Sequence, residues 1–217
     1  MTENFAEARL SMVLSQLRPN NVTSDRVADA MNTVPREEFV PKDLRGVAYM
    51  DEDLAIAEGR YLIEPRVFAR LLQEARVEES DVVLDVAVGT GYSSAVLGEL
   101  AQAVVAIEST AGMVEKASEI LTRLEADNVA VVEGNLQDGN AKQGPYNVIH
   151  VNGAIPAVPQ ALLDQLADGG RLICVIGTNP GVATVIYRKG DRFHDEQVFD
   201  AAVPALPELR PAEEFSF

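Results

Sequence analysis

The stretch VVLDVAVGTGYSS, residues 82–94, decides which fold this sequence predicts. A short apolar run that carries Asp85 leads into a turn with Gly89 and Gly91, and a segment of helical character follows. A strand, a glycine turn and a helix in direct succession are the repeating unit of doubly wound α/β sheets. Ligands of such sheets bind beyond the carboxyl ends of the strands. This turn is therefore the first candidate for a ligand site, although many strand–helix corners carry glycine without binding anything.

The second half of the chain repeats this succession of strands and helices. Five runs are nearly all apolar, which predicts parallel strands covered on both faces: residues 82–86, 103–108, 129–134, 146–151 and 171–177. Helices are predicted between most of them, at residues 92–101, 111–125 and 158–167. Two further runs, at residues 181–190 and 192–204, predict an antiparallel hairpin at the sheet edge. The predicted fold class is α/β, a doubly wound, mostly parallel, seven-stranded sheet of Rossmann-like type.

The N-terminal section is predicted to be helical. Apolar spacing predicts one helix over residues 5–17 and a second that begins at Thr23 or Ser24 and ends at Pro35. Residues 35–60 are predicted to be mostly irregular, and long irregular segments often form lids or binding loops. The three charges of residues 36–38 are interpreted as a solvated turn. After a third helix that begins near Pro65, the sheet domain is expected over residues 77–217, packed with residues 1–76 as one compact unit.

The composition argues against several classes of protein. The 217 residues fit one domain with a sizeable core, and 34 acidic against 18 basic residues give a net charge of −16. Such a surface repels phosphate backbones and anionic lipids, so we expect neither nucleic-acid nor membrane binding. No run approaches the length of a membrane span, and the first residues do not resemble a signal peptide, which predicts a cytoplasmic protein.

Metal and thiol chemistry are not indicated either. The chain has one cysteine, Cys174, within an apolar run, and two histidines, His150 and His194. We expect Cys174 to be a buried, inert thiol. His150 is interpreted as a packed or hydrogen-bonded structural residue and His194 as a surface residue. No metal site is expected from this set.

The glycine turn has the features of a nucleotide-cofactor site. Asp85, Gly89, Gly91 and the start of the next helix would place backbone N–H groups around a ligand. Glu108 ends the second strand, 17 positions after Gly91, close to the offset at which an acid binds a ribose. The alternative is that Glu108 is a solvated strand-end acid and Asp85 a helix-capping group. The third glycine of dinucleotide dehydrogenases is missing, and D-x-x-x-G-x-G resembles the S-adenosylmethionine-binding turn of methyltransferases, where the Asp faces the amino-acid end of the cofactor.

Blocks along nearly the whole chain resemble the protein-L-isoaspartate O-methyltransferase family. They are QLRPNNVTSDRVADAMNTVPREEFVP, AYMDEDLAI, LDVAVGTGYSSAVLGELA, QLADGGRLICVIG and FDAAVPAL. The resemblance implies that residues 77–217 form an S-adenosylmethionine-binding methyltransferase domain. It also implies methyl transfer to the α-carboxylate of isoaspartyl residues, which starts the repair of damaged proteins. The expected partner is therefore a peptide or protein carboxylate, with residues 56–65 covering the acceptor.

The sequence departs from the family pattern at several site positions. The family loop G-Q-T-I-S-x-P reads GRYLIEP over residues 59–65, so Ile63 stands where the family has its active-site serine. No catalytic residue is assigned here. Ala87 replaces the first glycine of the turn, and GNL replaces G-D-G after the third strand. The cofactor site that the resemblance implies consists of Asp85, Ala87, Gly89, Gly91, Tyr92, Glu108, Asn135 and Leu136.

These departures weaken the site without abolishing it. Ala87 costs about 1 kcal/mol if its φ is positive and nothing if its φ is negative. Asn135 can accept a hydrogen bond from adenine, though a weaker one than a carboxylate accepts, and Leu136 can contact the ring. A carboxylate acceptor with a pKa of ~4 needs no general base, so the missing serine would slow methyl transfer without necessarily silencing it. Three functions stay open: an isoaspartyl methyltransferase, an inactive relative that binds cofactor or a protein partner, and a methyltransferase for another acceptor.

Overall fold

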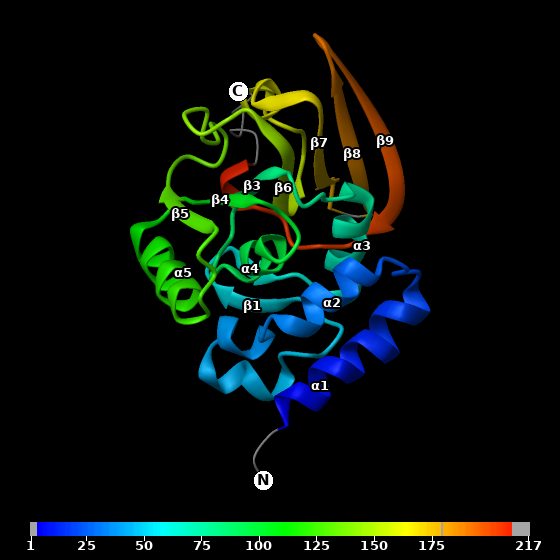
Figure 1. The fold of residues 1–217 in the computed structure, drawn as a ribbon, viewed down its shortest axis with the longest axis vertical. Coiled ribbons are helices and arrows are strands. Elements are labelled where there is room, and N and C mark those ends of the chain that lie inside the picture. The colour runs from blue at the N-terminus through cyan, green and yellow to red at the C-terminus, as the bar shows by residue number, and fades with distance from the viewer. Residues whose placement is uncertain (1–3, 179, 210–217) are drawn as a thin grey trace, which may run out of the picture.

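The glycine turn follows an interior strand, third in the order of a seven-stranded sheet, in the computed structural model, which describes residues 4–178 and 180–209 (Figure 1). The strand order is β5-β4-β3-β6-β7-β8-β9, and the pairs are parallel from β5 to β7 and antiparallel from β7 to β9. The strands are β3 (Val82–Val86), β4 (Ala103–Glu108), β5 (Val129–Glu133), β6 (Tyr146–Ile155), β7 (Leu166–Ile176), β8 (Gly181–Lys189) and β9 (Arg192–Ala201). The predicted α/β class, the seven strands and the antiparallel edge hairpin are confirmed.

Alternate residues of the strands face two separate apolar layers. Val83 of β3 belongs to a layer with side chains of α3 (Pro65–Ala75) and α4 (Tyr92–Gly98), such as Phe68 and Val96. Leu84, its neighbour, belongs to a layer on the other face with Leu162 of α6 (Gln160–Asp164). Both faces of the sheet are covered, which explains why the strands read as unbroken apolar runs rather than as alternating ones.

The N-terminal helices, coloured blue, gather at the lower end of the view in Figure 1. They are α1 (Phe5–Met12), which continues as a π-helical turn (Val13–Leu17), and α2 (Asp25–Thr33). The Ser24 hydroxyl accepts the Val27 N–H at 3.4 Å, so Ser24 is the N-cap of α2. Near the β5 edge of the sheet, α5 (Ala111–Arg123) packs on β4 and β5. Within the described residues, no helix is both long enough and apolar enough to span a membrane.

The segment between α2 and α3 is more ordered than the sequence predicts. It contains two 3-10 helices (Arg36–Phe39 and Lys42–Val47) and a two-stranded antiparallel hairpin, β1 (Leu54–Ala57) with β2 (Arg60–Leu62). Strands of three and four residues are too short to show a period in the sequence, and the 3-10 turns form through local bonds such as Glu38 N–H to Pro35 O at 3.0 Å. The prediction that residues 35–60 are mostly irregular is therefore wrong over these helices and strands.

The charged residues 36–38 do not form the solvated turn that their composition suggests. Arg36 is 0% exposed, and its Nε and Nη2 donate to the carbonyls of Ala48 and Ile63 at 2.7 and 2.8 Å. Glu37 is also buried and pairs with Arg9 at 3.3 Å. Burial, the largest influence, lowers the pKa of Arg36 below its ordinary value. This correction has a tertiary cause, because the partners lie 12 and 27 positions away along the chain.

Candidate active site

Asp85, at the end of β3, is the centre of a buried polar network. Its Oδ2 accepts hydrogen bonds from the hydroxyls of Ser93 and Ser94 at 2.6 and 2.7 Å. Its Oδ1 accepts from Asn152 Nδ2 at 2.7 Å and lies 2.8 Å from His150 Nδ1. The carboxylate is 0% exposed and bonds side chains, not the backbone N–H groups of α4, so it is not the helix cap considered as an alternative. It ties together β3, the first turn of α4 and β6.

The histidine and cysteine side chains have the surroundings expected of structural residues. His150 is fully buried, bonded to Asp85, and its ring lies 5.7 Å from that of Phe68. Cys174 is buried and free, and burial raises the pKa of its thiol to about 12. His194 is exposed on β9. The described residues contain no group of three or more His, Cys, Asp or Glu arranged to hold a metal ion.

In the turn after β3, every second residue has a left-handed backbone conformation. The φ angles are +63° at Ala87, +56° at Gly89 and +93° at Gly91. Glycine adopts this conformation freely, whereas an alanine there costs about 1 kcal/mol. The strained alternative for Ala87 therefore applies. Gly89 is also needed for close packing, since a Cβ there would lie 2.7 Å from Cδ1 of Ile56 in the hairpin.

Glu108, at the end of β4, is buried rather than solvated, which rules out the simpler explanation of this acid. Its Oε2 accepts the Gly89 N–H at 2.9 Å, so the acid is bound to the glycine turn. Oε1 accepts the Ser109 N–H at 2.6 Å. The Arg60 guanidinium binds both oxygens, with Nε to Oε2 at 2.8 Å and Nη2 to Oε1 at 2.7 Å. The predicted ribose-binding acid therefore lies at the turn, as expected, but it is paired with an arginine.

Arg60 also binds a second carboxylate, from the C-terminal end of the described chain. Its Nη1 and Nη2 donate to Glu208 at 3.1 and 2.8 Å. Burial lowers the pKa of Arg60, but the hydrogen bonds and charges of Glu108 and Glu208 outweigh burial, so that the net pKa lies above the ordinary value. The sequence shows Arg60 only as the second residue of the GRYLIEP loop and gives no sign of Glu208, because no spacing rule links residues 60, 108 and 208.

A hollow of about 740 Å³ is lined by Ser109, the neighbour of Glu108, and by the two residues predicted to face adenine. Its lining consists of Ser109, Glu133, Gly134, Asn135, Leu136, Gln137 and Glu208. Leu136 is buried, whereas Asn135 is exposed and its Oδ1 accepts the Gln137 N–H at 2.8 Å. The hollow is large enough for a nucleoside, and the adenine-side residues and the strand-end acid are adjacent, as the cofactor assignment requires.

Val88 and Tyr92 of the turn also line a second, much smaller hollow. A hollow of about 10 Å³, room for a single water, is lined by Tyr61, Leu62, Ile63, Phe68, Val88, Tyr92, Ser93 and Asn152. Ile63 thus lines the same small hollow as Tyr92 of the turn. Tyr92 is buried with the Arg36 guanidinium 4.8 Å from its ring centre, and burial raises the pKa of its hydroxyl. That hydroxyl and Arg36 Nη1 have no hydrogen-bond partner among the described residues.

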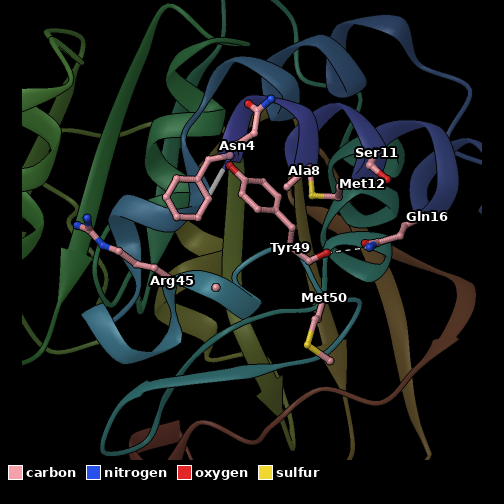
Figure 2. Close-up of a pocket in the computed structure, with 10 residues that line it drawn as sticks. Asn4, Ala8, Ser11, Met12, Gln16, Arg45, Tyr49 and Met50 are labelled. Atoms are coloured by element: carbon pink, nitrogen blue, oxygen red, sulfur yellow. Dashed lines mark hydrogen bonds between the residues drawn. The ribbon is translucent and has the colours of Figure 1, made fainter. Parts of the chain in front are cut away.

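A separate cavity of about 450 Å³ lies between α1 and the segment 45–50, on the N-terminal section (Figure 2). Figure 2 shows Gln16 of this cavity donating to the carbonyl of Tyr49, at 2.7 Å. Its lining is Asn4, Phe5, Ala8, Ser11, Met12, Gln16, Arg45, Gly46, Tyr49 and Met50. None of the eight predicted cofactor residues lines it, so it is not part of the candidate active site.

Comparison with known proteins agrees with this geometry. A mostly parallel sheet with a glycine turn after β3, a buried acid ending β4 and a nucleoside-sized hollow is typical of Rossmann-like proteins that bind a nucleotide cofactor. The chain belongs to the protein-L-isoaspartate(D-aspartate) O-methyltransferase family, whose profile matches residues 8–203. It is 40% identical to the protein-L-isoaspartate O-methyltransferase of Koribacter versatilis over 185 residues, which is 85% of this chain and 83% of that protein. Its identity to the enzyme of Aeropyrum pernix is also 40%, over 86% of this chain and 74% of that one.

Solved structures of the family have the same fold. A protein-L-isoaspartate O-methyltransferase superposes with a TM-score of 0.79 at 25% identity, covering 91% of this chain and 65% of that chain. A structure from Plasmodium falciparum, described as a putative enzyme of this kind in complex with S-adenosyl-L-homocysteine, also gives 0.79, at 22% identity, over 92% of this chain and 98% of that chain. The methyltransferase fold that the sequence predicts is therefore confirmed over most of the described chain.

Proposed function

We propose that this chain binds S-adenosylmethionine at the carboxyl ends of β3 and β4 and methylates the α-carboxylate of isoaspartyl residues in damaged proteins. The observation that carries the proposal is the position of Glu108, buried at the end of β4, bonded to the Gly89 N–H and adjacent to the 740 Å³ hollow. In this assignment Glu108 binds the ribose hydroxyls, while Asn135 and Leu136 bind adenine. The turn from Asp85 to Gly91 lies at the methionine end.

The residues present fit this cofactor, because Glu108 accepts the Gly89 N–H of the turn and its neighbour Ser109 lines the hollow. The cofactor supplies an electrophilic methyl group on a sulfonium. An isoaspartyl carboxylate with a pKa of ~4 is ionised at neutral pH, so no side chain has to remove a proton. The protein's contribution is to align the carboxylate oxygen with the methyl carbon and to exclude water. An apolar Ile63 in this position can exclude water but cannot orient the acceptor by a hydrogen bond.

The test is transfer of labelled methyl to an isoaspartyl peptide, with the matching aspartyl peptide as the negative control. We expect transfer to the isoaspartyl peptide alone, and a strong loss of transfer in Glu108→Gln. Glu99→Gln is a matched control, because Glu99 is an exposed residue at the end of α4. Circular dichroism of each variant separates loss of the site from loss of the fold. Equal transfer to both peptides, or to neither, would contradict the proposed acceptor.

A second candidate function is a cofactor-binding relative with little catalytic activity. The specific observation in its favour is that both ends of the site are engaged, with Arg60 on Glu108 and Ile63 in the small hollow. The same assay with Ile63→Ser distinguishes the two. Transfer that appears only in Ile63→Ser, with unchanged cofactor binding, would favour the inactive relative.

A further inference from the structure

Arg60 occupies the atoms that a bound ribose would need. A carboxylate has about four lone-pair positions. Glu108 already accepts two bonds from Arg60, one from the Gly89 N–H and one from the Ser109 N–H, and the Ser109 hydroxyl adds a fifth at 3.1 Å. Ribose hydroxyls cannot hydrogen-bond to Glu108 until at least one of these donors leaves. The Gly89 and Ser109 donors bind one oxygen each, whereas Arg60 binds both, so only the departure of Arg60 frees a position on each oxygen.

The hairpin that carries Arg60 also covers the turn itself. Ile56 of β1 packs against Gly89 so closely that a Cβ on this glycine would lie 2.7 Å away. Tyr61, Leu62 and Ile63 close the small hollow at the methionine end, which has room for one water only. One short element therefore contacts both the acid assigned to the ribose and the turn assigned to the methionine end.

A second carboxylate makes release of the arginine easier. Arg60 binds Glu208 through Nη1 and Nη2, and the Glu208 side chain is 40% exposed where that of Glu108 is fully buried. An arginine that leaves Glu108 can keep Glu208 as a partner near solvent, so it is not left as a buried, unpaired charge. Displacement therefore requires a shift between two carboxylates, not the complete loss of an ion pair.

We propose that the β1–β2 hairpin is a latch on the cofactor site, in which Arg60 competes with the cofactor ribose for Glu108 and so sets the affinity for S-adenosylmethionine. This inference rests on the proposed function, since it takes Glu108 as the ribose-binding acid. Binding of the cofactor then requires the hairpin to withdraw from the turn while Arg60 stays on Glu208.

The first test is calorimetric titration of S-adenosylhomocysteine into the wild type, Arg60→Gln, Arg60→Lys and Arg66→Gln. Removing the competitor should tighten binding at least tenfold in Arg60→Gln. Arg60→Lys should lie between the two, because an ammonium keeps the charge but cannot bind both oxygens in a fork. Arg66→Gln is the matched control, since Arg66 follows the hairpin, pairs with Glu64 at 2.9 Å and should leave the affinity within twofold.

The outcomes separate the latch from the proposed function. Tighter binding by Arg60→Gln, or binding by this variant alone, supports the latch. Equal or weaker binding than wild type overturns the latch and leaves the proposed function standing. Absence of binding by every protein overturns both.

A second measurement does not depend on how well Arg60→Gln folds. Hydrogen exchange of the Arg60 Nε–H, followed by NMR in the wild type, should become at least tenfold faster when S-adenosylhomocysteine saturates the protein. The Arg36 Nε–H, which donates to Ala48 O at 2.7 Å, is the internal control and should not change. An Arg60 Nε–H that stays equally protected in the saturated protein overturns the latch.

Discussion

Two buried carboxylates at the glycine turn, Asp85 and Glu108, differ in their partners: the partners of Asp85 belong to the main sheet and its helix, and those of Glu108 include a residue of the small hairpin. Asp85 is bonded to side chains of α4 and β6. Strand β6 is paired with β3 in the main sheet, and α4 follows β3 and packs on the sheet. Glu108 is bonded instead to Arg60, on a hairpin whose two strands are too few to be stable alone, and through it to Glu208. The first network therefore belongs to the permanent scaffold, while the second joins parts that can separate.

The largest expected effect follows from the scaffold network. Asp85→Ala should lower the free energy of unfolding by about 3 kcal/mol or more, because several buried donors lose their acceptor at once. Urea unfolding measures the loss. Asp127→Ala is the control, since Asp127 is exposed and should change stability by less than about 0.5 kcal/mol. A loss below about 1 kcal/mol for Asp85→Ala would mean that the network is not a structural centre.

Features formed by residues close together in the sequence could be predicted, whereas contacts between distant segments could not. The strand, the turn and α4 were predictable because their pattern is local and continuous over residues 82–98. The burial of Arg36 and the pairing of Glu108 with Arg60 were not, since each contact joins segments more than ten positions apart. The hairpin escaped prediction because strands of three and four residues carry no usable period. Local chemistry thus identified the acid at the turn, and only the tertiary structure shows what binds it.

A middle-sized effect is expected within the turn, where Ala87 has a φ of +63°. Ala87→Gly should raise the free energy of unfolding by about 1 kcal/mol, because glycine removes the left-handed strain. Ala161→Gly is the matched control with the opposite sign, since Ala161 lies in α6 and glycine in a helix costs about 0.5–1 kcal/mol. Denaturant midpoints of both variants at constant slope measure the difference. Destabilisation by Ala87→Gly would show that the strain at this position is compensated by contacts of its methyl group.

The smallest effect is expected at the outer end of the latch. Glu208→Gln should cost less than about 1 kcal/mol at neutral pH, because the Glu208 side chain is 40% exposed and solvent screens its pairing with Arg60. Burial alone would raise the pKa of Glu208, but the hydrogen bonds and charge of Arg60 hold it below its ordinary value. A lowered pKa in the folded state means that the stabilisation exists above the unfolded-state pKa of ~4.3 and disappears as the pH falls through the folded-state value.

The difference in stability between wild type and Glu208→Gln should therefore be present at pH 7 and disappear on acidification, as the pH falls through the lowered folded-state pKa of Glu208. Thermal unfolding of both proteins over this range measures it, with Glu99→Gln as an exposed control that should show no such pH dependence. A cost that persists in acid would mean that Glu208 stabilises the chain through packing instead of charge. In that case Glu208 could not serve as the second partner of a displaced Arg60, and release of the latch would leave the guanidinium to solvent alone.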